Sequence, residues 1–188
     1  MKKWKSFKLL LLFIVALYLI NTYLGNAGVV RESMEQNHDD LTLSELTAEM
    51  EFGQSFVYNQ NNLCGVSIKL GSFMRQNDGD LVLGIRKFGE ENDIYQTSVK
   101  ANSIIDNEFF DFRFPPIKLS KNKEYYVYIK SPNGKQGSSI TVYASQDDNY
   151  KDGTLYVNGK QQSGDLTMKV YYDRNIFVVV TDYLKRIF

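Results

Sequence analysis

Short segments in which apolar and polar residues alternate constrain the fold of this chain more than any other feature. Val66, Ile68 and Leu70 alternate with Ser67 and Lys69. The same period of two recurs at 81–85, 110–114, 125–129, 140–142 and 166–170. Such alternation is typical of strands that have one buried face and one exposed face.

Turn-forming residues separate these segments, for example Asn-Asp-Gly-Asp at 77–80, Pro-Asn-Gly at 132–134 and Lys-Asp-Gly at 151–153. No long amphipathic helix lies between them, which excludes alternating strands and helices around a parallel sheet. We therefore predict an all-β domain over 46–173, an antiparallel jelly roll or β-sandwich of about eight or nine strands.

The N-terminal segment has the composition of a membrane signal. Four lysines lie within 1–8, a basic n-region, and 9–20 is uninterrupted apolar sequence. A signal anchor or transmembrane helix over 9–28 is one interpretation, because such a span is long enough to cross a bilayer. A signal peptide cleaved after Gly-Asn-Ala at 25–27 is the alternative. Both place the basic segment in the cytoplasm and export the remaining chain, as a single-pass membrane protein or a secreted one.

Two further segments flank the predicted β-domain. Positions 29–45 are polar and acidic with no apolar period, which predicts a tether. Positions 174–188 carry an apolar helical stripe, which predicts an amphipathic tail at a membrane interface. A helix packed on the sandwich or on a partner, or a final strand through Val180, are the alternatives. The residues proposed to contact the membrane are Phe177, Leu184, Lys185, Arg186 and Phe188.

Several stretches resemble a jelly-roll domain that recurs in bacterial envelope proteins. They are F-G-Q-S-F at 52–56, R-Q-N-D-G-D-L at 75–81, I-I-D-N-E-F-F-D-F-R-F-P-P-I at 104–117, K-E-Y-Y-V-Y-I-K-S-P at 123–132, and the closing Y-K-D-G-T-L-Y-V-N-G at 150–159 with S-G-D-L-T-M-K-V-Y at 163–171. In that family the domain is often attached to membrane-spanning segments, and some members are linked to surface-glycan assembly. The resemblance, over about 46–172, implies a β-sandwich at the bacterial cell membrane and supplies no catalytic residue set.

Catalytic motifs are missing from the sequence. The only histidine is His38, the only cysteine is Cys64, and no nucleophile, zinc-protease or phosphate-loop motif occurs. We therefore predict a protein that is not an enzyme, with a glycan-active enzyme that uses two carboxylates as a distant alternative. The candidate acids are Asp106, Glu108, Asp111, Asp147, Asp148, Asp152 and Asp165.

Ligand binding is the more plausible activity. Basic and acidic residues number 22 each, which gives no support to nucleic-acid binding. Tyr126, Tyr128, Tyr143 and Tyr171 are candidates for a sugar-binding aromatic surface, with packing inside the sandwich as the alternative. Asp147, Asp148 and Asp152 are candidates for a structural calcium site, and no other cofactor is expected.

Two functions follow from these features. The first is a membrane-tethered accessory or scaffold protein of the cell envelope that binds a partner protein. The second is a module that binds a surface glycan.

Overall fold

The computed structural model describes the backbone of residues 2–24 and 29–174, and the side chains of 7–20 and 30–174. The chain forms two compact units, one that contains the N-terminal helix and one that spans Glu32–Tyr172. The tail predicted over 174–188 falls, from position 175 onward, outside the described residues. The expectations for Phe177, Leu184, Lys185, Arg186 and Phe188 therefore stay predictions.

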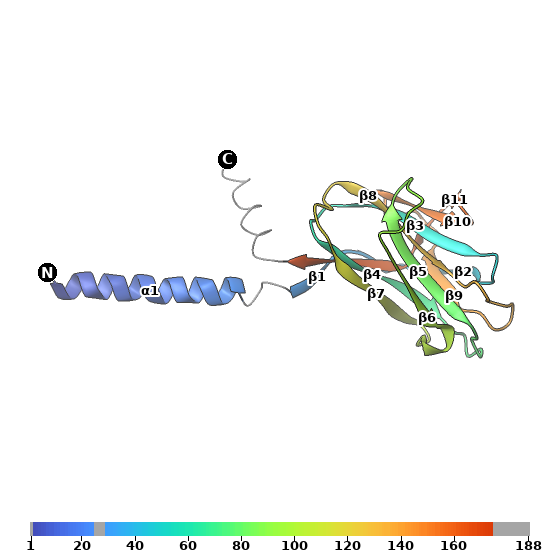
Figure 1. The fold of residues 1–188 in the computed structure, drawn as a ribbon, viewed down its shortest axis with the longest axis horizontal. Helices are drawn as coiled ribbons and strands as arrows, with labels where there is room; N and C mark the ends of the chain where they lie inside the picture. The colour runs from blue at the N-terminus through green and yellow to red at the C-terminus, as the bar shows by residue number, and fades with distance from the viewer. Residues whose placement is uncertain (1, 25–28, 175–188) are drawn as a thin grey trace. The chain divides into compact units, whose positions relative to one another are not determined.

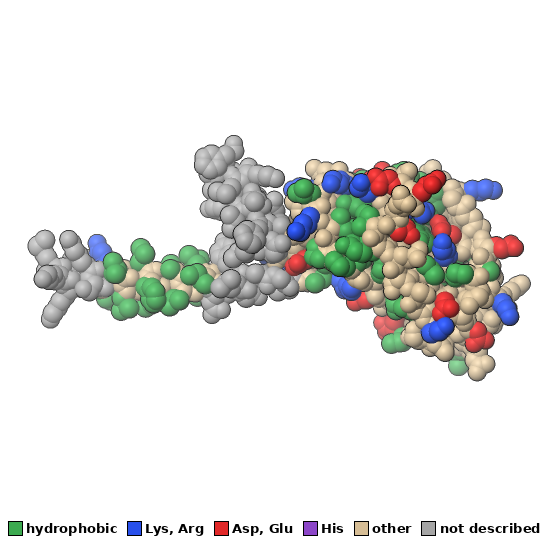
Figure 2. Space-filling model, viewed as in Figure 1, with side chains coloured by type: hydrophobic (Ala, Val, Ile, Leu, Met, Phe, Trp, Pro, Cys, Tyr) green, Lys and Arg blue, Asp and Glu red, His purple; other side chains and the backbone are tan. Residues whose placement is uncertain are grey.

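Helix α1 (Lys2–Leu24) occupies the segment in which an N-terminal helix was expected. Its described side chains are mostly apolar and exposed, as Leu9 and Leu12 illustrate, and they cover the helix surface in Figure 2. Among the described residues, no helix has the combination of length and apolarity that crossing a bilayer requires.

The second unit is built from two antiparallel sheets, shown in Figure 1. The larger sheet comprises β1 (Val29–Gln36), β2 (Leu41–Glu45), β4 (Leu63–Gly71), β7 (Glu108–Ile117), β9 (Thr141–Ser145), β12 (Asp165–Leu166) and β13 (Met168–Arg174). The smaller sheet has the order β11 (Lys160–Gln162), β10 (Gly153–Val157), β3 (Glu51–Tyr58), β8 (Lys123–Lys130), β5 (Asp80–Lys87) and β6 (Tyr95–Lys100). A single 3-10 turn, η1 (Ala101–Ser103), is described between β6 and β7. The predicted all-β antiparallel sandwich is confirmed.

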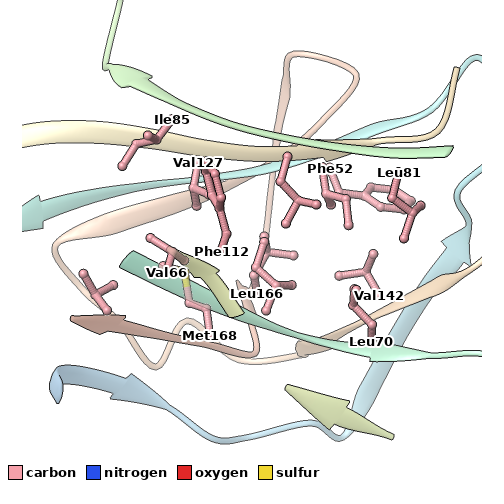
Figure 3. Close-up of a cluster of buried hydrophobic side chains, with 14 of the residues drawn as sticks. Phe52, Val66, Leu70, Leu81, Ile85, Phe112, Val127, Val142, Leu166 and Met168 are labelled. Atoms are coloured by element: carbon pink, nitrogen blue, oxygen red, sulfur yellow. The ribbon is translucent and has the colours of Figure 1, made fainter. Parts of the chain in front are cut away.

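The core lies between the two sheets. Val66, Ile68 and Leu70 of β4 are fully buried and face Leu81 and Val127 of the other sheet across the interior. Figure 3 shows side chains from the two sheets pointing toward one another. The alternation in the sequence therefore reports this geometry directly, because successive residues of a strand point to opposite faces.

The prediction of a tether over 29–45 was wrong, because β1 and β2 are strands of the larger sheet. Ser33 of β1 donates a hydrogen bond to the Tyr58 hydroxyl at 3.0 Å, and Glu35 pairs with Lys169 at 2.5 Å. β2 pairs with β9, with Leu41 opposite Ala144. β1 has no clear apolar period, and β2 alternates over only five residues, whose inward side chains are half-buried.

The number of strands was also underestimated. The described residues contain thirteen strands, against the eight or nine expected. The additional ones include the polar β1 and β2, the exposed hairpin strand β11 and the two-residue β12. Short or polar strands are held by backbone hydrogen bonds to their neighbours, and a hydrophobic pattern does not report such bonds.

Hydrogen exchange of the full chain distinguishes strands from a tether. We expect alternate backbone amides of 32–36 and 41–45 to exchange slowly, because those amides donate to β13 and β9. Glu91 and Asn92, exposed in the β5–β6 turn, serve as the unprotected reference. Exchange in 32–36 and 41–45 as fast as in this turn would contradict the strand assignment.

Candidate ligand-binding face

Two of the predicted tyrosines lie side by side on the outer face of the smaller sheet. Tyr126 and Tyr128 alternate with core residues of β8, so both rings point away from the interior. Their ring centroids are 6.3 Å apart and the ring planes are 24° from parallel. Gly53 of β3 and Gly84 of β5 make room for them, because a Cβ at either glycine would lie within 2.4 Å of a tyrosine ring atom.

Arg86 of β5 covers these two rings. Its guanidinium carbon lies 4.9 Å from the Tyr126 centroid and 5.0 Å from the Tyr128 centroid, a cation–π arrangement. Ion pairs of 3.9 Å to Glu51 and to Asp93 hold the guanidinium in place. The face therefore has a layered construction in which a salt-bridged arginine lies on two flat tyrosines.

Hydrogen bonds to the same two acids orient the tyrosine hydroxyls. Tyr126 donates to Glu51 at 3.3 Å, and Tyr128 donates to Asp93 at 2.6 Å. The exposed fractions of the side chains are only 6% for Tyr126 and 1% for Tyr128. Burial raises the pKa of Tyr128 to about 12, and the hydrogen bond to Asp93 adds to the rise. Burial also raises the pKa of Tyr126. Both phenols therefore stay neutral at physiological pH.

A shallow pocket of about 280 Å³ opens beside this layer. Phe88, which is 42% exposed, and Tyr156 stand at the pocket with ring centroids 5.9 Å apart. Tyr126 contributes the floor, since its centroid is 5.7 Å from that of Tyr156. We call this site the face pocket; its lining residues are Glu51, Arg86, Phe88, Gly89, Glu90, Tyr126, Tyr156 and Gly159.

Of the residues proposed from the sequence, only Tyr126 lines the face pocket, and Tyr128 lies next to it. Arg86, Phe88 and Tyr156 were missed, although Tyr156 alternates with the buried Leu155 and is therefore placed by the strand period on the outer face. These side chains meet because β10, β3, β8 and β5 are consecutive neighbours in the smaller sheet. The order of strands in a sheet cannot be derived from a local sequence pattern.

The other two predicted tyrosines lie on the larger sheet, so the four do not form one aromatic surface. Tyr143 stacks on Phe73 with centroids 6.0 Å apart. Tyr171 lies beneath Arg113, whose guanidinium carbon is 3.5 Å from the ring centroid. Both tyrosines are half-buried, and each ring is covered by a neighbouring side chain, Phe73 of the loop after β4 or Arg113 of β7.

The acidic loop 146–152 does not gather the three proposed calcium ligands into a metal-binding group. Asp148 instead forms an ion pair with Lys151 at 3.1 Å. Throughout 7–20 and 30–174, no group of three His, Cys, Asp or Glu side chains is placed to hold a metal ion, and this includes Asp147 and Asp152.

Asp165 holds the loop 146–152 in place through hydrogen bonds to its backbone. Its carboxylate accepts hydrogen bonds from the backbone N–H groups of Asn149 at 2.7 Å and Tyr150 at 2.8 Å, and from Gln54 Nε2 at 2.9 Å. The side chain is 1% exposed, and this burial raises its pKa. We assign Asp165 a structural role.

Two other candidate acids also take part in structural bonds. Asp106 accepts hydrogen bonds from the backbone N–H groups of Ser72 and Phe73 at 2.6 and 2.8 Å, and these bonds lower its pKa. Asp111 accepts hydrogen bonds from Ser67 and from Arg113.

Comparison of the sequence with models of known protein families finds no match, and comparison with curated proteins finds none either.

Proposed function

We propose that this chain is a non-catalytic, exported β-sandwich that binds an envelope glycan through the face pocket. The observation that carries the proposal is the pairing of two solvent-reachable rings, Phe88 and Tyr156, with the charged groups Glu51 and Arg86 in one small pocket. A sugar presents both an apolar C–H face and hydroxyl groups, so it needs both kinds of contact. Most ligand sites combine apolar walls with a few placed polar groups in this way.

The polar groups of the face pocket are suited to hydroxyl recognition. Arg86 supplies only donors, and the Glu51 carboxylate supplies only acceptors. Because the two are already ion-paired with each other, a ligand of high charge is not needed to neutralise either. Charge-assisted hydrogen bonds to hydroxyls would then orient the sugar while the rings supply apolar contact.

The setting of the module is part of the same proposal. The basic residues of 1–8 and the apolar residues of 9–20 support a signal anchor with a cytoplasmic N-terminus, with secretion after cleavage as the alternative. The sequence stretches described above support a jelly-roll sandwich of the bacterial cell envelope. Tethering at the membrane would hold the face pocket among surface glycans.

An array of bacterial surface polysaccharides tests the proposal. The full chain is applied in a detergent without a sugar headgroup, so that the detergent does not compete. We expect Phe88→Ala and Tyr156→Ala each to weaken binding by about 10-fold or more, as removal of an aromatic anchor does. Tyr171→Ala, which removes a half-buried tyrosine from the larger sheet, is the matched control and should leave binding unchanged.

Two results would count against glycan binding at the face pocket. One is an intact full chain that binds no polysaccharide on the array. The other is a loss of binding in Tyr171→Ala as large as that in Tyr156→Ala.

A scaffold that binds a partner protein is the second candidate, supported by an exposed apolar cluster on the loops after β4 and before β7. We define the apolar tip as Phe73, Met74 and Ile105. Met74 is 97% exposed, and Asp106 joins the two loops through its hydrogen bonds to Ser72 and Phe73. Isolated exposed apolar residues are ordinary, but a cluster of them marks an interaction surface.

Photocrosslinking in cells tests this second candidate. A photoreactive residue at position 74 should give one defined protein adduct if the apolar tip docks a partner. The same residue at Leu119, which is also exposed on a loop, is the control. Equal adducts from both positions, or none from either, would remove support for the scaffold.

A further inference from the structure

A second pocket, of about 410 Å³, lies at the opposite end of strand β5 from the face pocket. The face pocket adjoins the C-terminal end of β5 at Arg86, whereas this one adjoins the residues that precede Asp80. We call it the edge pocket, and it shares no lining residue with the face pocket. Its lining residues are Ser72, Arg75, Gln76, Asn77, Asp78, Asn102 and Ile104.

The lining of the edge pocket is almost entirely polar. Gln76, Asn77 and Asn102 contribute amides, each of which can donate and accept hydrogen bonds, and Ser72 contributes a hydroxyl. No aromatic ring lines it, so stacking is not the mode of binding here. This set of groups matches a ligand that carries several neutral hydroxyl or amide groups.

The charges around the edge pocket are balanced. Arg75 pairs with Glu45 at 3.5 Å and donates to the Thr141 hydroxyl at 2.6 Å, so its positive charge is shared within the protein. Asp78 brings one carboxylate. An anion is therefore poorly matched, and the described residues hold no group of three acidic, histidine or cysteine ligands for a cation.

Two buried polar atoms of the lining residues have no hydrogen-bond partner among the described residues. They are Asn77 Oδ1, an acceptor, and Arg75 Nε, a donor. Asn77 is only 4% exposed, and its Nδ2 is held by the carbonyl oxygen of Arg75 at 3.0 Å. Buried polar groups are nearly always satisfied, so these two atoms are exceptions among the residues that line the pocket. Both atoms are buried, so a ligand hydroxyl would reach them only after a side-chain movement.

The wall of the edge pocket is held in a defined shape before any ligand arrives. Phe73 and Met74 adopt left-handed backbone conformations, with φ of 50° and 58°, and Asp106 fixes this turn through two backbone N–H groups. On the other side, the backbone N–H of Asp78 donates to the carbonyl oxygen of Ser138 at 3.1 Å. Consecutive left-handed residues other than glycine are costly and persist mainly where the surroundings require them.

We propose that the edge pocket is a second saccharide site, one that recognises the hydroxyl groups of an uncharged sugar without aromatic stacking. This inference deepens the proposed glycan-binding function but rests on its own residues, so either pocket can fail without the other. Two sites at opposite ends of β5 would let one molecule hold two units of a polymer, which raises avidity without any new contact.

Amide NMR titration of the isotopically labelled full chain, in a detergent without a sugar headgroup, tests the edge pocket. The probes are free D-glucose, D-galactose and N-acetyl-D-glucosamine in the millimolar range, with D-glucuronate as the charged comparison. We expect at least one uncharged sugar to shift the amide signals of 76–78 and Asn102, and D-glucuronate to shift them less. Signals of 88–90 and Tyr156 report the face pocket separately.

Variants show whether the shifts come from recognition by the lining amides. Gln76→Ala and Asn102→Ala should each raise the dissociation constant measured at 77–78 by about fivefold, the effect of one neutral hydrogen bond. Asn59→Ala, an exposed amide just after β3, is the matched control and should have no effect. Phe88→Ala should alter only the signals of the face pocket.

Each outcome decides one of the two proposals. If no uncharged sugar shifts the signals of 76–78 and Asn102, or if the shifts survive both alanine variants unchanged, the edge pocket is overturned. If those signals shift while 88–90 and Tyr156 do not, the edge pocket stands and the face pocket fails. A stronger response to D-glucuronate than to the three neutral sugars would also overturn the ligand class proposed here.

Discussion

Replacing Asp165 by Ala is expected to lower the free energy of unfolding by about 3–4 kcal/mol, because three buried or half-buried donors would lose their acceptor at once. The donors are Gln54 Nε2 and the backbone N–H groups of Asn149 and Tyr150. Urea unfolding of the full chain, followed by far-ultraviolet circular dichroism, measures the change. The only tryptophan is Trp4, in the N-terminal helix, so circular dichroism is used in place of tryptophan fluorescence.

Asp148→Ala is the matched control for this substitution. It removes an acid from the same loop, but one that is exposed and whose one ion pair within the described part of the chain is with Lys151. Exposed pairs contribute little, so the free energy of unfolding should change by less than about 0.5 kcal/mol. An effect of Asp165→Ala as small as that of Asp148→Ala would show that the loop tolerates the loss of Asp165 and that its role is not structural.

The pH dependence of Asp165 has a definite sign. Burial raises the pKa of this carboxyl group in the folded state above its value in the unfolded chain. The folded state therefore binds the proton more tightly than the unfolded chain does. The contribution of Asp165 to the free energy of unfolding then rises as the pH falls from above the folded-state pKa toward the unfolded-state pKa. Relative to Asp165→Asn, the wild type should therefore gain stability on acidification from neutral pH.

Gly53→Ala should destabilise the sandwich by about 1–3 kcal/mol and weaken glycan binding at the face pocket, because the new methyl group would overlap the Tyr126 ring. A Cβ at position 53 would lie 2.1 Å from the Tyr126 hydroxyl oxygen and 2.2 Å from the adjoining ring carbon. The ring would have to leave the sheet surface, which removes the floor of the pocket and its hydrogen bond to Glu51.

A double-mutant cycle separates this clash from a backbone effect. Adding Tyr126→Ala removes the ring, so the cost of Gly53→Ala should be much smaller in that background than in the wild type. Gly53 is not among the glycines with a positive φ, so an alanine there adds a steric clash and no left-handed backbone strain. Strict additivity of Gly53→Ala and Tyr126→Ala would mean that the ring does not lie over Gly53.

The sequence predicted part of the candidate sites. Strand period alone placed Tyr126 and Tyr128 on an outer face, and the structure confirms that they are neighbours there. The strand period did not reveal that the two rings lie flat on the sheet beneath another side chain. Gly53 and Gly84 on the two flanking strands leave the space for the rings, and Arg86 covers them. Neighbours across strands depend on register, which a local pattern does not contain.

The sequence by itself determined the all-β character, the central strands and their buried faces. Alternating apolar and polar residues bounded by Gly, Asn and Asp turns indicate a β-strand, so β4, β5 and β8 could be recognised from their own residues. The tertiary structure decided the rest. Backbone pairing makes the polar β1 and β2 part of the larger sheet. Tyr126 and Tyr128 lie on one sheet, whereas Tyr143 and Tyr171 lie on the other. Phe88 and Tyr156, far apart in the sequence, line the same pocket. These outcomes follow from contacts between residues far apart in the chain, whose energies depend on strand order and register.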